Sequence, residues 1–196
     1  MTTSPKQFVP VLVVCALFSL AGAPALQAQV KVDAEQRYLL LATKKTATMQ
    51  KELQEAAALG FRVLVGSPTS GTEMAVFLER VATPPDIYQY KLLATTRTGT
   101  MQKELNEMAA DGYRLLPRTM ISKVDITPFK GGQEIVVLLE KEPNSKRHYD
   151  YKLLATTLTS TLQKEVKEAM EAGYILAGMV SRGEHMVIME KEIANK

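Results

Sequence analysis

The sequence predicts an α+β fold of three tandem βαββ modules, each a small three-stranded, mainly antiparallel sheet with one helix, after an N-terminal signal peptide. Three observations lead to this prediction. Residues 38–61, 90–113 and 151–174 align without a gap and are identical at about half of their positions, which indicates internal duplication. Each segment changes from a strand-like pattern to helical periodicity. A run of consecutive apolar residues, typical of a strand that is covered on both faces, follows in each copy.

Residues 1–28 have the layout of a secretory signal peptide. Lys6 precedes an apolar run over residues 8–20, and small residues follow up to Ala28. The run is shorter than the roughly 20 residues of a membrane-spanning helix. Cleavage after Ala25 or Ala28 would leave a periplasmic or secreted protein with no membrane span. The only cysteine lies inside this segment, so the mature chain would have no disulfide and no cysteine ligand.

Each module begins with a strand and continues into an amphipathic helix. We expect the modules to cover residues 35–83, 87–142 and 147–194. The first strands start at tyrosines, which we interpret as core or interface aromatics whose hydroxyls reach water, with ligand stacking as the alternative: Tyr38, Tyr90 and Tyr151. The helices carry one apolar stripe at helical spacing: Met49, Leu53 and Ala56; Met101, Leu105 and Met108; Leu162, Val166 and Ala169.

A glycine followed by an aromatic residue ends each helix: Gly60 and Phe61, Gly112 and Tyr113, Gly173 and Tyr174. Glycine adopts the left-handed conformation that closes a helix, and the aromatic residue can fold back on the last turn. A short second strand and the apolar last strand complete the module.

The last strands, over residues 74–80, 135–141 and 186–191, are apolar at consecutive positions. Both faces of such a strand should be covered. Since the helix of the module can cover only one face, we expect the other face to meet another repeat or another chain. If the last strand lies between the first two, every neighbouring pair is antiparallel, and we predict that strand order.

The repeated motifs also resemble those of a known family. The second copy carries Tyr88-Gln89-Tyr90-Lys91, Glu104-Leu105-Asn106 and Gly112-Tyr113; the third keeps Tyr149-Asp150-Tyr151-Lys152 and Gly173-Tyr174; the first keeps Tyr38, Glu52-Leu53 and Gly60-Phe61. This combination resembles the bacterial family called domain of unknown function 4177, three times over nearly all of the mature chain. The resemblance implies a fold and brings no activity, catalytic residue or cofactor.

Composition and motifs argue against several function classes. The net charge of +3 is small, which does not favour a nucleic-acid partner. The chain has no Gly-x-Ser-x-Gly, His-Glu-x-x-His or phosphate-binding loop motif. His148 and His185 have no partners at metal-ligand spacing. We therefore expect no enzymatic activity, no metal and no cofactor.

Two polar repeats are candidate binding sites. The helices share a Gln-Lys-Glu segment, which is either a repeated polar site or, as we favour, a solvated face with Lys–Glu pairs four residues apart. Threonines recur around the helix starts, and we interpret them as strand-end and N-cap residues. Alternatively, they bind a small anion or polar ligand, especially if the modules form a pseudo-threefold ring. The candidate ligand-binding residues are Thr46, Thr48, Thr98, Thr100, Thr159 and Thr161.

The second module alone has an insert, residues 117–132. It is either a projecting hairpin or loop that binds a partner or a tolerated insertion. Together these features favour an exported, non-catalytic repeat protein that binds another protein, an envelope component or itself as a homo-oligomer. The alternatives are a binder of a small polar ligand or anion at the threonine segments, and an enzyme of unrecognised type.

Overall fold

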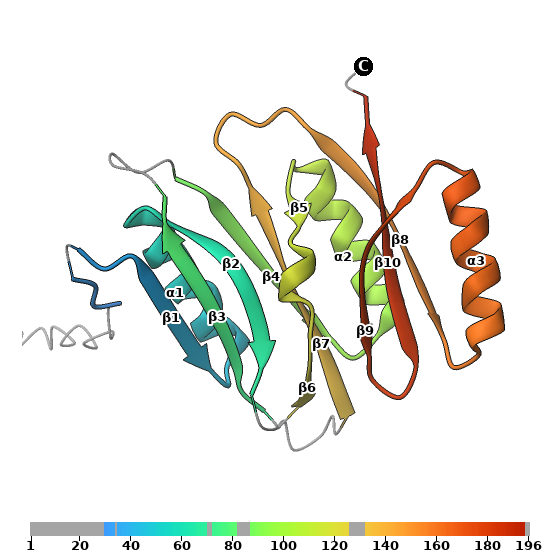
Figure 1. Cartoon of the computed structure of the whole chain (residues 1–196), viewed down its shortest axis with the longest axis horizontal. Coiled ribbons are helices and arrows are strands. Elements are labelled where there is room, and N and C mark those ends of the chain that lie inside the picture. Colours follow the sequence, from blue (N-terminus) through green and yellow to red (C-terminus); the bar gives the residue numbers. More distant parts are fainter. Residues whose placement is uncertain (1–29, 34, 70–71, 82–86, 126–131, 195–196) are drawn as a thin grey trace, which may run out of the picture.

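The computed structural model describes residues 30–33, 35–69, 72–81, 87–125 and 132–194. It confirms the α+β fold of three helix-and-sheet modules, which follow one another along the long axis of the molecule (Figure 1). The predicted signal peptide, residues 1–28, lies outside the described residues. In the part of the chain that the structure describes, no helix has the length and apolar character needed to cross a membrane.

Every module has the same order of elements, with additions in the second. The first module contains β1 (Tyr38–Thr43), α1 (Thr46–Ala58), β2 (Phe61–Pro68) and β3 (Met74–Arg80). The second contains β4 (Gln89–Thr95), α2 (Thr98–Ala110), β5 (Arg114–Leu115), the 3₁₀ helix η1 (Pro117–Thr119), β6 (Ile121–Asp125) and β7 (Gly132–Lys141). The third contains β8 (His148–Thr156), α3 (Thr159–Glu171), β9 (Ile175–Ser181) and β10 (His185–Ile193).

The last strand of each module is the central one. The strand orders are β1-β3-β2, β4-β7-β5 and β8-β10-β9, with antiparallel pairing on both sides, and β6 also pairs with β7. The predicted order is therefore confirmed. The most apolar strand occupies the centre because that position removes both of its edges from water.

The glycines that end the helices have the expected conformation. The φ angles of Gly60, Gly112 and Gly173 are 85°, 86° and 89°. Phe61 and Tyr113 directly follow two of these glycines and are buried. A residue with a Cβ atom is strained at such a φ angle, so glycine is required at these helix ends.

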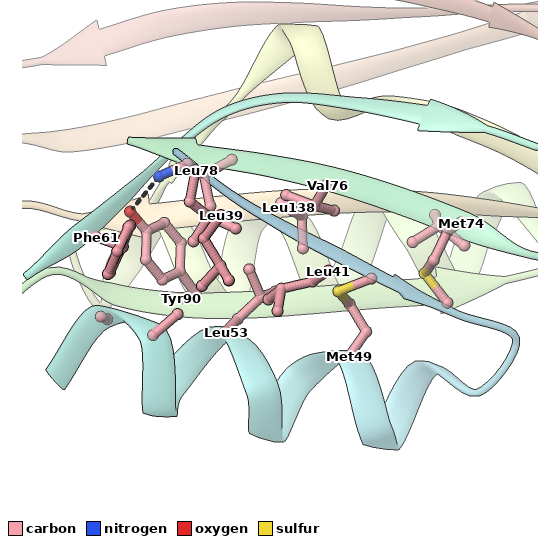
Figure 2. Close-up of a cluster of buried hydrophobic side chains, with 14 of the residues drawn as sticks. Leu39, Leu41, Met49, Leu53, Phe61, Met74, Val76, Leu78, Tyr90 and Leu138 are labelled. Carbon is pink, nitrogen blue, oxygen red and sulfur yellow. Dashed lines mark hydrogen bonds between the residues drawn. The ribbon is translucent and has the colours of Figure 1, made fainter. Parts of the chain in front are cut away.

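Each sheet has a front face towards its own helix and a back face. On β7, alternate residues pack with α2 in one core, and the others pack in the core of the first module: Ile135, Val137 and Leu139 in front, Val136 and Leu138 at the back. On β10, Val187 and Met189 pack with α3, whereas Met186 and Ile188 enter the core of the second module. Figure 2 shows Tyr90 and Leu138 of the second module among the core side chains of the first.

The modules therefore form a linear stack rather than a ring, because the back faces of the second and third sheets each lie in the core of the preceding module. The expected cover on both faces is confirmed for β7 and β10. On β3 only the front face is covered by described residues, and Phe77 on its back face is 46% exposed. The stack thus has two different ends, the back face of the β1–β3 sheet and the outer side of α3 and β9.

The described part of the insert, residues 117–125, packs against the neighbouring modules, so of the two alternatives for the insert a projecting loop does not apply there. Helix η1 and β6 lie against β2 of the first module and β9 of the third. Thr119 and Ile121 are fully buried, and Lys123 pairs with Glu134 at 2.9 Å. Residues 126–131 lie outside the described residues.

Two glycines of α2 and its C-terminal turn give a matched test of the helix end. The substitution Gly112→Ala should lower the free energy of unfolding by about 1–2 kcal/mol, because alanine is strained at the left-handed φ angle. The substitution Gly99→Ala should leave it unchanged or raise it slightly, since a Cβ atom at this helical position meets nothing within 4 Å. Urea unfolding of both variants measures the difference. Equal effects would contradict the assignment.

Candidate functional site

The junctions between modules repeat one set of contacts. In the first junction, Gln50 of α1 reaches the outer edge of β4. Its Nε2 donates to the carbonyl of Tyr90 at 2.9 Å, and the backbone N–H of Leu92 donates to its Oε1 at 2.8 Å. One side chain thus satisfies two backbone groups of an edge strand, which would otherwise remain unpaired in a partly buried interface.

Gln102 makes the same pair of hydrogen bonds in the second junction. Its Nε2 donates to the carbonyl of Tyr151 at 2.6 Å, and the backbone N–H of Leu153 donates to its Oε1 at 2.6 Å. Asn106, one turn further along α2, accepts from the backbone N–H of Tyr151 at 2.9 Å. Helix α2 therefore binds β8 as α1 binds β4.

A buried tyrosine, a carboxylate and an arginine form the second element of each junction. The Tyr90 hydroxyl donates to Glu140 at 2.8 Å and accepts from the backbone N–H of Val63, in the preceding module, at 3.0 Å. The guanidinium of Arg62 binds the same carboxylate, with a shortest distance of 2.6 Å. The Val63–Tyr90 bond is the dashed line in Figure 2.

The second junction repeats this network. The Tyr151 hydroxyl donates to Glu190 at 2.8 Å and accepts from the backbone N–H of Leu115 at 2.8 Å. Arg114 binds Glu190 at 2.8 Å. In both networks the carboxylate belongs to the later module and the arginine to the earlier one. The contact therefore has a direction, from the second strand of one module to the central strand of the next.

Burial controls the ionisation of these groups. It raises the pKa of the Tyr90 and Tyr151 hydroxyls far above its ordinary value, and the neighbouring carboxylates add to the increase. The hydrogen bonds to Glu140 raise the pKa of Arg62, which stays charged. The predicted interface role of these tyrosines is confirmed, but the expectation that their hydroxyls reach water is wrong, since both are bonded within the protein.

The back face of the first module carries the same residues without a preceding module. We call this surface the sheet end and define it by Tyr38, Leu40, Phe77 and Glu79. Tyr38 is 48% and Leu40 50% exposed, whereas Tyr90 and Tyr151, aligned with Tyr38, are at most 2% exposed. Arg37 of the same chain binds Glu79 at 2.8 Å, and Gln36 Nε2 donates to the carbonyl of Tyr38 at 2.8 Å.

The outer side of the third module carries the opposite half of a junction. We call this surface the helix end and define it by Gln163, Met170, Ile175 and Leu176. Gln163 is exposed, although Gln50 and Gln102 at the aligned positions are partly buried in junctions. Met170, Ile175 and Leu176 are each about 60% exposed. Ile175 stands where the other modules have Arg62 and Arg114.

The threonine predictions are only partly met. The helices begin at Thr46, Thr98 and Thr159, and the residues in the N-cap position make no side-chain capping bond: Lys45, Arg97 and Leu158. The N-cap role is therefore wrong. The threonines at the ends of the first strands make the local hydrogen bonds instead. Their hydroxyls accept the backbone N–H two residues later: Thr43, Thr95 and Thr156.

The candidate ligand residues Thr46, Thr48, Thr98, Thr100, Thr159 and Thr161 lie on three different helices. Figure 1 shows these helices separated along the molecule by the intervening strands. The linear stack therefore does not bring the threonine segments together, as a pseudo-threefold ring would have done. A binding role for any one segment stays a prediction.

The repeated Gln-Lys-Glu segment has two separate roles. The predicted pairs four residues apart are present, at 3.5 Å for Lys51 and Glu55 and 3.7 Å for Lys103 and Glu107. The glutamines, however, bind the next module, so the interpretation of the whole segment as solvated is wrong at Gln50 and Gln102. The sequence does not single out the glutamine, because the Lys and Glu that follow it are also identical in all three copies.

A pocket of about 250 Å³ lies beside the first junction and is lined by Arg62, Arg114, Arg147 and Glu140 among others. Its basic lining suggests an anion site. Arg62 already binds Glu140 and Glu142, and Arg114 binds Glu190. These two guanidinium groups hold the junctions together and are occupied by carboxylates.

The described residues contain no group of three or more His, Cys, Asp or Glu side chains that could hold a metal ion. Every buried side-chain nitrogen or oxygen in the described ranges has a hydrogen-bond partner. The buried polar groups of the described junctions thus satisfy one another.

The tyrosine hydroxyl can be tested against an aligned control. Tyr90→Phe should lower the free energy of unfolding by about 1–3 kcal/mol, because it leaves the buried Val63 N–H without a partner and removes one of the hydrogen bonds of Glu140, which keeps Arg62. Tyr38→Phe, at the exposed aligned position, should change it by less than about 0.5 kcal/mol. Chemical unfolding at low protein concentration measures both. A similar loss for both variants would show that the junction network is not the cause.

The glutamine gives a second matched pair. Gln102→Ala should destabilise the protein by about 1–2 kcal/mol, since two backbone groups of β8 lose their partner. Gln163→Ala should be neutral in the same measurement, because Gln163 is exposed. Hydrogen exchange of the Leu153 amide should also become faster in the Gln102 variant only. Unchanged exchange at Leu153 would contradict the assigned bond.

Comparison of the chain with protein-family models, with curated proteins and with solved structures finds no match in any of the three. The resemblance to the domain of unknown function 4177 family therefore stays a prediction, and the functional argument rests on the geometry of the junctions and of the two ends.

Proposed function

We propose that the protein is an exported, non-catalytic repeat protein that binds another protein through the two ends of its stack. The observation that carries this proposal is the exposure of the sheet end. Phe77 is 46% exposed, whereas the aligned Leu138 and Ile188 are at most 2% exposed. The back face of the sheet is thus buried in the second and third modules and exposed in the first.

The chemistry of both ends supports a protein partner. Terminal repeats of a stack usually present a polar outer face to water. Here the sheet end presents Tyr38, Leu40 and Phe77, and the helix end presents Met170 and Ile175. Contiguous exposed apolar side chains on a soluble domain mark interaction surfaces. The mixture with an ion pair and an exposed glutamine resembles a protein interface, with its apolar centre and polar surround.

Two further features favour a non-catalytic role. The tyrosines and arginines whose pKa is raised lie in the hydrogen-bond networks of the junctions, and their partners are protein groups. The partly buried carboxylate of the sheet end, Glu79, is paired with Arg37. Glu140 lines the pocket beside the first junction, but its carboxylate is already bound by Arg62 and Tyr90 and is not free to act as a general acid or base. Export rests on the predicted signal peptide.

Capture from the native cell envelope tests the proposal. The immobilised protein should retain one or a few envelope proteins, and Phe77→Asp should lose them because a charge cannot enter an apolar interface. Val124→Asp is the matched control, since Val124 is also a strand residue with 46% exposure, but it lies on β6 and belongs to neither end. Mass spectrometry identifies the retained proteins. Equal retention by the wild type and the Phe77 variant, or no retention by either, would contradict the proposal.

A further inference from the structure

We infer that the partner is a second copy of this chain, docked head to tail, with the sheet end of one molecule on the helix end of the next. This inference rests on the proposed function and names its partner. The two internal junctions define the contact that the third, intermolecular junction would repeat. The two ends are the two halves of that contact.

The hydrogen-bonding groups of a junction are present at the ends. Gln163 aligns with Gln50 and Gln102, and Tyr38 and Leu40 align with the residues of β4 and β8 that those glutamines bind. Gln163 in one molecule would therefore face the Tyr38 carbonyl and the Leu40 N–H of the next. The Tyr38 carbonyl already accepts from Gln36, but a carbonyl oxygen has two lone pairs and can accept a second bond.

The apolar groups also correspond. Phe77 occupies the position of Leu138 and Ile188, which enter the core of the preceding module in the internal junctions. In the intermolecular junction Phe77 would meet the exposed apolar residues of the helix end. The other half of the tyrosine contact is present too, since Leu176 aligns with Val63 and Leu115, whose N–H groups donate to the buried tyrosines.

The charged groups at the two ends differ from those of the internal junctions, and the two differences complement each other. The helix end has Ile175 where the internal junctions supply Arg62 or Arg114 to the carboxylate of the next module. The sheet end has Arg37, at 2.8 Å from Glu79, where the other modules have Gln89 and Asp150. Glu79 thus brings its own counter-ion. The contact with Ile175 would bury a neutral pair rather than an isolated carboxylate, which would be costly.

An exposed isoleucine at the position where the other two modules have arginine is opposite to what solubility alone would favour. It fits a surface that another protein covers. Because the two ends differ, the contact is heterologous, and repeated docking extends a chain of molecules or closes a ring instead of stopping at a symmetric dimer.

Complementation between two blocked variants tests the inference. Phe77→Asp removes the sheet end and Ile175→Asp removes the helix end, so sedimentation of each variant alone should show a monomer. Their equimolar mixture should form a one-to-one heterodimer, because each supplies the end that the other has lost. The wild type should grow in mass with concentration beyond a dimer. Complementation also shows that both variants are folded, and unfolding midpoints close to the wild-type value check this independently.

An arginine exchange tests the charge arrangement. Arg37→Ala should weaken the association of the wild-type ends at least about tenfold, because Glu79 is then buried without a partner. Adding Ile175→Arg should restore it, since the arginine then comes from the preceding molecule, as in the internal junctions. Failure of the double variant to recover, while the single variant is weakened, would overturn the proposed register.

Other outcomes would overturn the inference and separate it from the proposed function. A dimer formed by either blocked variant alone would indicate a symmetric contact between like ends. A wild type that stays monomeric at all concentrations, yet binds an envelope protein in a Phe77-dependent way, would leave the proposed function intact and remove the second copy as partner. A monomer that captures nothing would remove both.

Discussion

The structure depends on one constraint, which is that a three-stranded sheet with a single helix cannot bury both of its faces. The front face packs on the helix of the same module, and the back face needs a cover from outside. In β7 and β10 the back-face residues Leu138 and Ile188 obtain it from the preceding module. The duplication therefore produced a stack in which each module stabilises its neighbour, as in other repeat proteins whose energetics are dominated by nearest-neighbour contacts.

The polar part of the junction fixes how the modules meet. Apolar packing alone tolerates sliding and repacking, whereas Tyr90, Glu140 and Arg62 satisfy one another in only one register. A buried ion pair contributes little net stability, because desolvation offsets its attraction. The ion pair instead favours one arrangement of the modules, because any other arrangement would leave a buried carboxylate unpaired, which is unfavourable. The same logic applies to Gln50, whose amide matches two specific backbone groups of β4.

Sequence patterns predicted the module well because its determinants are local. The helical spacing of Met101 and Leu105, the glycine at position 112 and the apolar run of β7 each act within one repeat. The arrangement of modules was not predictable in the same way. Gln102 and Arg114 have ordinary surface roles in a helix and a strand until the next module is in place, and a ring and a linear stack use the same local patterns. The N-cap part of the threonine prediction failed for a related reason, since Thr95 closes its turn from the strand end rather than capping α2.

A linear stack of like modules always leaves one half-junction at each end. The residues there indicate whether water or another protein covers it. If only water met them, a polar outer face would be favoured there, as in the terminal repeats of other stacks. At the sheet end Phe77 instead keeps an apolar residue at the position of Leu138, and at the helix end Ile175 replaces an arginine. The one charged group of the sheet end that would suffer from this loss, Glu79, is neutralised by Arg37. The two changes lie on opposite ends of one chain, and they complement each other only when the ends of two chains meet.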